Sequence, residues 1–338
     1  MTHDLPNRRT TLGAIGAAAF ASLAAQNLRA QDGLLGGSLE QRLTPPSGKV
    51  QAVVDTDTYN EIDDQFALSY ALLSPEHMNV EAVYAAPFKN ERSKTAGEGM
   101  QKSYEEILRI LERLKRKPDG FAFKGSRQFM AGAEQPVDSP AARDLVAKAM
   151  QPRSAPLYVL TIGAPTNVSS ALLMEPRIRD RIVVVWLGGQ PLNRKSAREF
   201  NLQQDIHASR MLLDSGVALV VIPTGNVSEH LRTTVPEVNH HLKGKSPIAD
   251  YLANEYAAYT KWKTPSDEFP LSRVIWDLSA VAWIIEPKWI PTEIVPSPKL
   301  NDDYTWAKPA GRHPVRFATW ANRDRVFDDV FQKLRNAR

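Results

Sequence analysis

Several short runs of this chain are apolar at consecutive positions, and this pattern constrains the fold more than any other feature. The clearest run is Val183-Val184-Val185-Trp186-Leu187. A strand with apolar side chains on both faces must be covered on both sides, as parallel strands between two layers of helices are. Runs of this kind alternate with longer stretches of helical periodicity. The predicted fold class is therefore α/β, an open and mostly parallel sheet flanked by helices, with a Rossmann-like core.

The expected strands and helices cover most of the chain after residue 48. The expected strands are residues 50–54, 80–85, 157–162, 182–187 and 217–222. The expected helices are residues 64–73, 99–116, 166–174, 248–262, 277–285 and 324–334. No internal repeat and no second linker interrupts this pattern, which predicts a single domain over residues 48–338. Ligands of open α/β sheets bind outside the carboxyl ends of the strands, so the residues directly after each strand are the first candidates for a site.

Residues 1–30 have the organisation of a twin-arginine export signal. The pair Arg8-Arg9 precedes a small, apolar stretch over residues 12–25, which is too short to cross a membrane. Leu28-Arg29-Ala30 loosely fits a small-x-Ala cleavage site, so we expect cleavage after Ala30. The alternative is a disordered basic tail ahead of a buried helix. The export interpretation places the mature protein in the periplasm or another exported compartment, with no membrane span left after cleavage.

Residues 31–47 are rich in Gly, Pro and Ser and are predicted to form a flexible leader.

Composition excludes several classes of function. The chain has no cysteine, which agrees with export in folded form and excludes thiol catalysis and cysteine-based metal sites. The formal net charge is +4, and residues 1–30, with three Arg and one Asp, supply half of it. The remaining charge is too evenly balanced to indicate a nucleic-acid partner.

The candidate chemistry is concentrated directly after the first expected strand. Five carboxylates fall within ten residues there: Asp55, Asp57, Glu61, Asp63 and Asp64. Their mutual repulsion at the end of a buried strand opposes folding unless a cation neutralises it, and a hard divalent cation takes oxygen ligands. The position after a buried strand favours such a metal site over a solvated acidic turn in which Asp63 or Asp64 caps a helix.

A haloacid-dehalogenase-type phosphatase is a weaker alternative, since it also has an Asp-x-Asp pair after an apolar strand. Asp55 would then be the nucleophile and Asp57 the acid. However, Tyr59 stands in place of the usual Thr or Val. The expected strand 182–187 also ends in Gly188-Gly189, with no acidic pair for Mg²⁺.

The opening acids and four later motifs resemble the calcium-dependent nucleoside hydrolases, in that family's order. The family opens with a strand and an Asp-x-Asp-x-x-x-Asp-Asp signature, and this chain has the same acids with two additional residues between the pairs. The later motifs are the strand and Gly-x-x-Thr-Asn turn at 160–167, Glu199-Phe200-Asn201 with Asp205, the helix at 276–283, and the closing strand His313-Pro314-Val315-Arg316. The resemblance thus extends over nearly the whole mature length and implies the same α/β fold.

The resemblance implies a Ca²⁺ cofactor. Its ligands would be the carboxylates of Asp57, Asp64 and Asp277 and the main-chain carbonyl of Ile162. Three carboxylates and a carbonyl leave several of calcium's six to eight positions for a water and two sugar hydroxyls. Asp63 would then accept hydrogen bonds from the ribose hydroxyls.

The resemblance also implies contacts to the rest of the sugar. The residues implied are Asn90, Asn193, Glu199 and Asn201, while Asp55 would support the acidic loop. Asn and Glu in loops mostly cap helices or face water, and that alternative stands for Asn90 and Asn193. The two additional residues fall within Tyr59-Asn60-Glu61 and could reshape the sugar pocket.

The implied activity is hydrolysis of the N-glycosidic bond of ribonucleosides to free base and ribose. Asp57 would take a proton from a calcium-bound water, while the surrounding carboxylates stabilise an oxocarbenium-like transition state. The implied partner is therefore a small nucleoside, and the chain is a possible homo-oligomer. The alternative is a non-catalytic exported protein of the same fold that binds calcium or sugar and releases no ribose.

Trp276 stands where many family members have a His that protonates the departing base. Trp cannot donate a proton at useful acidity, but a purine-preferring branch of the family has Trp there, and its indole is thought to stack on the purine and ease its protonation. The resemblance thus implies a purine preference, with Trp276 as a catalytic and substrate-binding residue. Further candidates are Tyr256, Tyr259 or Trp262 as a second wall of the base slot, or else core residues, and His230 or His313 as acids.

Overall fold

The computed structural model of this protein describes Met1, residues 37–265 and residues 271–338. The predicted signal peptide lies outside the described residues apart from Met1, and so does the predicted leader up to residue 36. Within the described part of the chain, no helix combines the length and the apolar character that a membrane crossing requires.

An eight-stranded sheet forms the centre of the molecule, with the strand order β3-β2-β1-β4-β5-β6-β12-β9. Every neighbouring pair is parallel except β12 and β9, which confirms the prediction of an open, mostly parallel sheet. The strands are β1 (Val50–Thr56), β2 (Met78–Ala85), β3 (Ala122–Lys124), β4 (Leu157–Thr161), β5 (Ile182–Leu187), β6 (Ala218–Ile222), β9 (Thr292–Pro296) and β12 (Pro314–Ala318). Two short antiparallel pairs lie outside this sheet: β7 (Arg232–Thr234) with β8 (Ser272–Val274), and β10 (Lys299–Leu300) with β11 (Trp306–Ala307).

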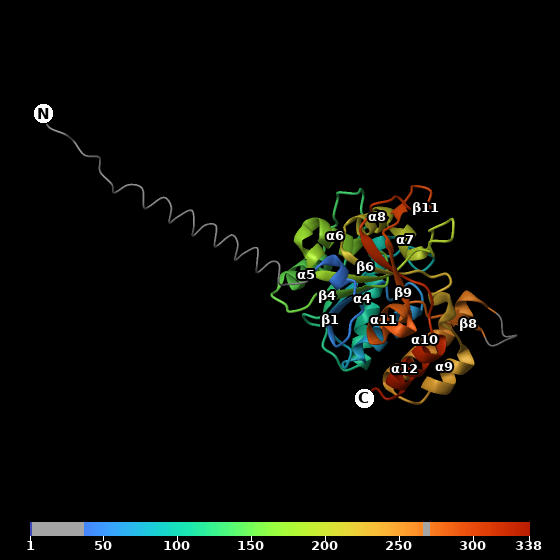
Figure 1. Cartoon of the computed structure of the whole chain (residues 1–338). Helices are drawn as coiled ribbons and strands as arrows, with labels where there is room; N and C mark the ends of the chain where they lie inside the picture. The colour runs from blue at the N-terminus through green and yellow to red at the C-terminus, as the bar shows by residue number, and fades with distance from the viewer. Residues whose placement is uncertain (2–36, 266–270) are drawn as a thin grey trace.

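Helices cover both faces of the sheet (Figure 1). Those on the first face are α3 (Asp63–Leu72), α4 (Ala96–Arg113), α9 (Val235–Leu242), α10 (Pro247–Lys263), α11 (Leu278–Ile285) and α12 (Arg323–Arg335). Those on the second face are α5 (Pro140–Met150), α6 (Thr166–Met174), α7 (Phe200–Gln204) and α8 (Ile206–Asp214). Successive strand residues face opposite layers: Val54 belongs to the first core and Val53 to the second. This two-sided burial explains the continuous apolar runs of the sequence.

The strand order reverses between β1 and β4. The chain runs outward from β1 through β2 to β3, and then returns to β4 on the other side of β1. The two connections therefore leave the carboxyl ends of β1 and β4 in opposite directions and open a crevice there, which is the usual position of a ligand site in such sheets. Asp57 and Ile162 lie directly after these two strands.

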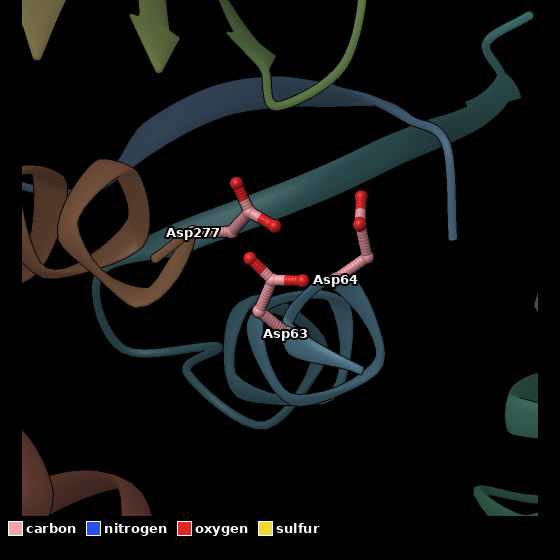
Figure 2. A group of neighbouring side chains, drawn as sticks. All are labelled: Asp63, Asp64 and Asp277. Atoms are coloured by element: carbon pink, nitrogen blue, oxygen red, sulfur yellow. The ribbon is translucent and has the colours of Figure 1, made fainter. Parts of the chain in front are cut away.

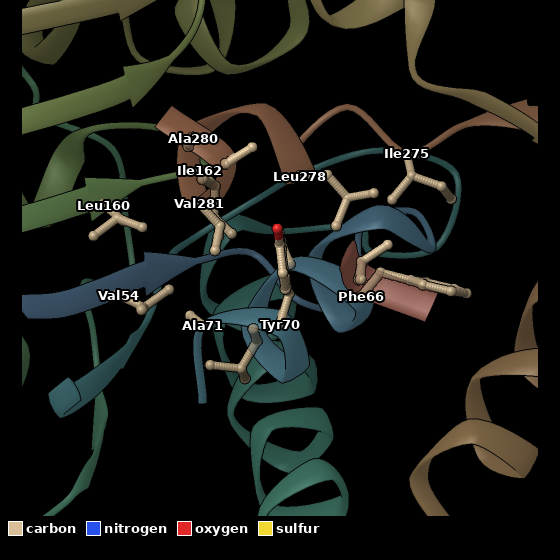
Figure 3. Close-up of a cluster of buried hydrophobic side chains, with 14 of the residues drawn as sticks. Val54, Phe66, Tyr70, Ala71, Leu160, Ile162, Ile275, Leu278, Ala280 and Val281 are labelled. Carbon is tan, nitrogen blue, oxygen red and sulfur yellow. The ribbon is translucent and has the colours of Figure 1, made fainter. Parts of the chain in front are cut away.

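The first core holds the starts of two helices against this crevice. Figure 3 shows Phe66 and Tyr70 of α3 beside Leu278 and Val281 of α11, with Leu160 of β4 in the same cluster. All five side chains are buried, and full burial of an apolar side chain of this size contributes about 1.5–3 kcal/mol. The packing therefore fixes the N-terminal ends of α3 and α11 relative to the ends of β1 and β4.

The described part of the predicted leader is packed, so the prediction of a flexible segment over 31–47 is wrong from residue 37 onward. The Ser38 hydroxyl caps a one-turn helix, α2 (Leu39–Arg42), by accepting from the N–H of Gln41, and the N–H of Ser38 donates to Oε1 of Gln41. Leu43 is buried in the first core, and Leu39 packs against it. Two leucines one helical turn apart thus outweigh the Gly- and Pro-rich surroundings, and the packed chain begins before residue 48.

Candidate active site

A cavity of about 280 Å³ opens at the carboxyl ends of β1, β4 and β5. Eight of the residues singled out from the sequence line it: Asp57, Asp63, Asp64, Ile162, Glu199, Asn201, Trp276 and Asp277. These residues come from segments more than 200 positions apart in the chain. The fold thus brings most of the predicted site together at the switch point of the sheet.

Two helix starts carry three of the acids. Asp63 and Asp64 lie in the first turn of α3, and Asp277 is the N-cap residue of α11. A carboxylate at a helix N-terminus is favoured by the partial positive charge of the exposed N–H groups. Figure 2 shows the three carboxylates directed into one space, and each offers an oxygen within 4.8 Å of the others. This trio includes Asp63, whereas the resemblance implied Asp57 as the third carboxylate ligand.

Asp57 lies just past β1 and borders the same cavity. Neither of its buried carboxylate oxygens accepts a hydrogen bond, and one oxygen of Asp277 is also without a donor. Asp64 is oriented by the Thr56 hydroxyl, which donates to its Oδ1 at 2.5 Å. Gly163 allows the turn after β4 to come close, because a Cβ there would lie 3.1 Å from the carboxyl carbon of Asp57. Asp57 is therefore held by its backbone and leaves both oxygens available.

The carboxylates of the cavity lie so close together that each makes ionisation of its neighbours less favourable. Burial raises the pKa of Asp57, Asp63 and Asp277 well above the ordinary value, and repulsion among these neighbours raises it further. Burial also raises the pKa of Asp55 and Asp64 to about 7. None of the ion pairs between described residues includes one of these five carboxylates. An all-oxygen donor set with unpartnered oxygens and no nearby cation fits a hard divalent ion such as Ca²⁺.

Asp55 supports the end of β1 from outside the cavity. Asn167, in the first turn of α6, donates to its Oδ1 at 2.7 Å. The main-chain carbonyl of Asp55 accepts from the N–H of Ile162 at 2.8 Å, as the parallel pairing of β1 and β4 requires. These bonds fix the two strand ends that carry Asp57 and Ile162, so the position of Asp55 agrees with the supporting role that the resemblance implied.

Glu199 and Asn201 border the cavity, but their resolved bonds are to the backbone. Glu199 is the N-cap residue of α7, and its carboxylate accepts from the N–H groups of Gly189 at 2.9 Å and of Asn201 at 3.0 Å. The Asn201 amide donates to the carbonyls of Leu187 at 3.1 Å and Ile162 at 3.3 Å. A carbonyl oxygen has two lone pairs, so Ile162 keeps one for another ligand. Sugar binding by Glu199 and Asn201 stays a prediction.

Two residues predicted to bind the sugar do not line the cavity. Asn193 is exposed and borders a different cavity, of about 610 Å³, beside β9 and β12. Asn90 instead contacts a residue of the cavity wall, because its amide donates to Oδ1 of Asn60 at 2.6 Å. The structure therefore gives Asn193 no place at the sugar and gives Asn90 an indirect one.

Of the aromatic candidates, Trp276 alone lines the cavity. Tyr256 is fully buried on α10, donates to the carbonyl of Thr233 at 2.8 Å and packs edge-on against Phe66, so it is a core residue. Tyr259 and Trp262 border a separate cavity of about 170 Å³. The expectation that one of these three forms a second wall of the base slot is not met, because α10 turns that face toward the core and toward the neighbouring cavity.

The histidine candidates also lie elsewhere. His230 packs at a tilt against the exposed ring of Trp320, with 4.0 Å between ring centroids. His313 precedes β12, and burial lowers its pKa. Among the described residues, the cavity wall contains no histidine. A protonated histidine therefore does not account for activation of the leaving group in the described cavity.

Several cavity residues were given no individual role in the sequence-based prediction. Gln190 and Thr224 follow β5 and β6, so the rule that singled out the ends of β1 and β4 would have found them on the next two strands. Asn60 and Glu61 belong to the segment that contains the two additional residues, and both line the wall. Leu187 and Phe200 supply its apolar part.

Comparisons with known proteins agree with this architecture. The sequence model of a family described as inosine-uridine preferring nucleoside hydrolase matches residues 52–328. The pyrimidine-specific ribonucleoside hydrolase RihA of Salmonella paratyphi A is 26% identical, with 70% of this chain and 79% of that protein covered.

Solved structures show the same fold. The purine-preferring ribonucleoside hydrolase from Gardnerella vaginalis is similar with a TM-score of 0.65 and 18% identity, covering 85% of this chain and 98% of that one. A plant nucleoside hydrolase is similar with a TM-score of 0.65 and 18% identity, covering 86% and 99%.

Proposed function

Because this chain belongs to the family of inosine-uridine preferring nucleoside hydrolases, which are N-glycosyl hydrolases, we propose that it cleaves purine ribonucleosides at a calcium site with Asp57 as the base. The observation that carries the proposal is the group of buried carboxylates around one cavity at the switch point of the sheet. Membership in the family, with this fold, favours nucleoside hydrolysis over the phosphatase alternative.

The chain offers a complete set of oxygen ligands for the ion. Asp57, Asp64 and Asp277 and the carbonyl of Ile162 would hold it, and Asp63 is close enough to share in the site or to contact the sugar. When bound, Ca²⁺ supplies positive charge that keeps the carboxylates ionised and makes a neighbouring water more acidic.

Asp57 is the residue best placed to take the proton of the attacking water. Both of its oxygens lack hydrogen-bond donors, whereas Asp64 is engaged by Thr56. As the water oxygen bonds to C1′ of the ribose and Asp57 takes the water's proton, the bond from C1′ to the base nitrogen breaks. The base keeps that electron pair, and a proton from solvent on the purine ring lets it leave as the neutral base. The sugar carries positive charge in the transition state, and the ionised carboxylates beside it stabilise that charge.

Trp276 carries the proposed purine preference. It is half-buried and lines the cavity next to Asp277. A purine that is protonated on its ring before it leaves carries positive charge, and an indole face stabilises that charge by about 1–2 kcal/mol when water is excluded. One relative is named as pyrimidine-specific and another as purine-preferring. The proposed purine preference therefore rests on Trp276.

We expect inosine to be hydrolysed with a higher kcat/KM than uridine. Trp276→Ala should lower kcat/KM for inosine about tenfold, the factor that corresponds to a loss of 1–2 kcal/mol, and should change uridine little. Initial rates of reducing-sugar release measure both. Trp320→Ala, which removes an exposed Trp outside the cavity, is the matched control and should leave both substrates unchanged. A wild-type preference for uridine would remove the stacking argument.

We further propose that the protein is exported through the twin-arginine route. The basis is the sequence of residues 1–30, with Arg8-Arg9 ahead of a short apolar stretch. Replacing Arg8 and Arg9 together by Lys should leave the full-length chain in the cytoplasm, whereas the wild type should appear in the periplasmic fraction with Gln31 as its first residue. Arg29→Lys is the control, and equal export of both variants would contradict the proposal.

A further inference from the structure

The segment Tyr59-Asn60-Glu61 forms a wall of the catalytic cavity, although none of its residues belongs to the proposed cation site. Asn60 is buried, Glu61 is half-buried, and both line the cavity that contains Asp63 and Trp276. Glu61 also lines the smaller cavity of about 170 Å³, next to Tyr259. Glu61 therefore stands between the two cavities.

A tight turn after β2 clamps this segment. Asn90 and Ser93 are paired through two main-chain hydrogen bonds of 3.1 and 3.2 Å. From this turn, the Asn90 amide donates to Oδ1 of Asn60 at 2.6 Å, and Nη1 of Arg92 donates to the carbonyl of Glu61 at 3.1 Å. The N–H of Arg92 in turn donates to Oδ1 of Asn90 at 2.7 Å. The turn thus holds residues 60 and 61 and leaves the Glu61 carboxylate outside the clamp.

The guanidinium of Arg92 is locked among three aromatic rings. Its central carbon lies 3.8 Å from the ring centroid of Tyr59, 5.4 Å from that of Tyr259 and 5.7 Å from that of Trp262. Cation–π contacts of this kind orient a guanidinium and stabilise its charge. Helix α10 is tied to the same turn by the ion pair between Glu91 and Lys263. Arg92 is therefore committed to the protein and is not free to bind substrate.

The Glu61 carboxylate has a different environment. Glu61 lines the smaller cavity together with Tyr259. Burial raises the pKa of its carboxyl, and the positive charges of Lys263 and Arg273 lower it. Glu61 lines the larger cavity together with Trp276 and the acids of the proposed cation site. A carboxylate in that position can accept a hydrogen bond from a molecule in the cavity.

We propose that Glu61 binds the substrate by accepting a hydrogen bond from one of its O–H or N–H groups, and that Asn90 and Arg92 are positioning residues that aim it. The inference rests on the proposed function, because it takes the cavity to be the nucleoside site. A carboxylate oxygen accepts hydrogen bonds, so Glu61 favours a nucleoside that presents a hydroxyl or an N–H group there over one that presents a carbonyl oxygen. Glu61 is thus a specificity-determining residue, and the donor belongs to the sugar or to the base.

Substitution of Glu61 tests the contact directly. Glu61→Ala should raise KM for inosine or uridine at least about tenfold while kcat stays within about threefold, and Glu61→Gln, which keeps one acceptor oxygen, should fall between. Glu255→Ala is the matched control, since Glu255 borders only the smaller cavity. KM values within about twofold of wild type for both substrates in Glu61→Ala would overturn the proposal.

A double-mutant cycle tests the positioning role. Arg92→Ala should raise KM by a factor similar to that of Glu61→Ala, and combining the two should add little, because both remove the same contact. Arg92→Lys keeps the charge but not the planar fork, so it should resemble Arg92→Ala. Independent, multiplying effects of the two substitutions would show that Arg92 supports the fold generally and would refute its positioning role.

Calorimetric titration with uncleaved probes separates this inference from the proposed function. The probes are formycin B and pseudouridine, C-nucleosides that have a C–C glycosidic bond, titrated in CaCl₂ into wild type and Glu61→Ala. If Glu61→Ala lowers the affinity for both probes equally, the group that donates to Glu61 belongs to the sugar. If it lowers the affinity for only one probe, that group belongs to the base. Wild type that binds these probes but releases no ribose from inosine or uridine would refute the proposed function alone. Unchanged binding by Glu61→Ala, or no binding by wild type, would overturn the inference.

Discussion

Asp57→Asn should lower kcat on every nucleoside by at least about 10³-fold, because general-base catalysis contributes about 10²–10⁴ and the same group also helps to hold the ion. The amide has the shape of the carboxylate but cannot take a proton. Both oxygens of Asp57 are buried without a hydrogen-bond donor, so the substitution breaks no bond that holds the fold. Reducing-sugar release from inosine and uridine, compared at saturating substrate, measures the loss.

The control for this variant is a neutralised aspartate far from the cavity. Asp180→Asn affects only the contacts of Asp180 with Arg42, at 3.1 Å, and with Arg179, at 3.3 Å, and should leave kcat unchanged. Thermal unfolding of Asp57→Asn should be as cooperative as that of wild type. An Asp57→Asn enzyme that keeps most of its activity would show that another group takes the proton.

Removal of divalent cations should abolish turnover, and addition of Ca²⁺ should restore it. Without a cation, the four buried carboxylates of the cavity repel one another or remain protonated, as the raised pKa of Asp57, Asp63 and Asp277 indicates. Ca²⁺ at a concentration of 100 Kd should stabilise the fold by about 2.7 kcal/mol and raise Tm on the order of 5 °C. Activity and scanning calorimetry on chelator-treated protein measure both effects.

A variant without two of the proposed ligands provides the control for calcium. Asp64→Asn with Asp277→Asn should melt at the same temperature with and without Ca²⁺ and should release no ribose. Mg²⁺ should restore wild type less well than Ca²⁺, since it demands near-octahedral geometry and gives up its waters reluctantly. Full activity of wild type in excess chelator would show that the carboxylates work without an ion.

The sheet could be predicted because its signal is local. Strand β5 has the predicted range, and its six residues are all buried, so a continuous apolar run is what its two covered faces require. Strand β9 gives the opposite case: it is an edge strand with three of five residues exposed, so its sequence lacks such a run and it was not predicted. The prediction of a flexible leader failed from residue 37 onward for a related reason. Leu43 is buried against residues that are remote in sequence, so no local pattern indicates its burial.

The site residues that directly follow a strand could be predicted from the sequence. Asp57 lies next to β1 and Asp63 and Asp64 begin α3, so one strand and one helix start place all three. Asp277 is more than 200 residues away, and the family resemblance rather than any local pattern brought it to the site.

The remaining loop residues depend on turns that composition does not determine. After β5, Gly189 adopts a φ of +74°, Gln190 lines the cavity, and the chain then leaves it, which takes Asn193 to another surface. Asn90 lies behind the cavity wall rather than on it, and its contact with Asn60 could not be read from the sequence. Tyr256 lies on the face of α10 that packs into the core, and the sequence did not indicate which face that is.

A crystal structure of the calcium-loaded protein tests the central claim most directly. We expect anomalous density for one ion at the carboxyl ends of β1 and β4, with oxygens of Asp57, Asp64 and Asp277 and the carbonyl of Ile162 at about 2.3–2.6 Å. An ion held by Asp63 while Asp57 stays uncoordinated would contradict the ligand assignment. A fully soaked crystal with no ion among these acids would contradict the account as a whole.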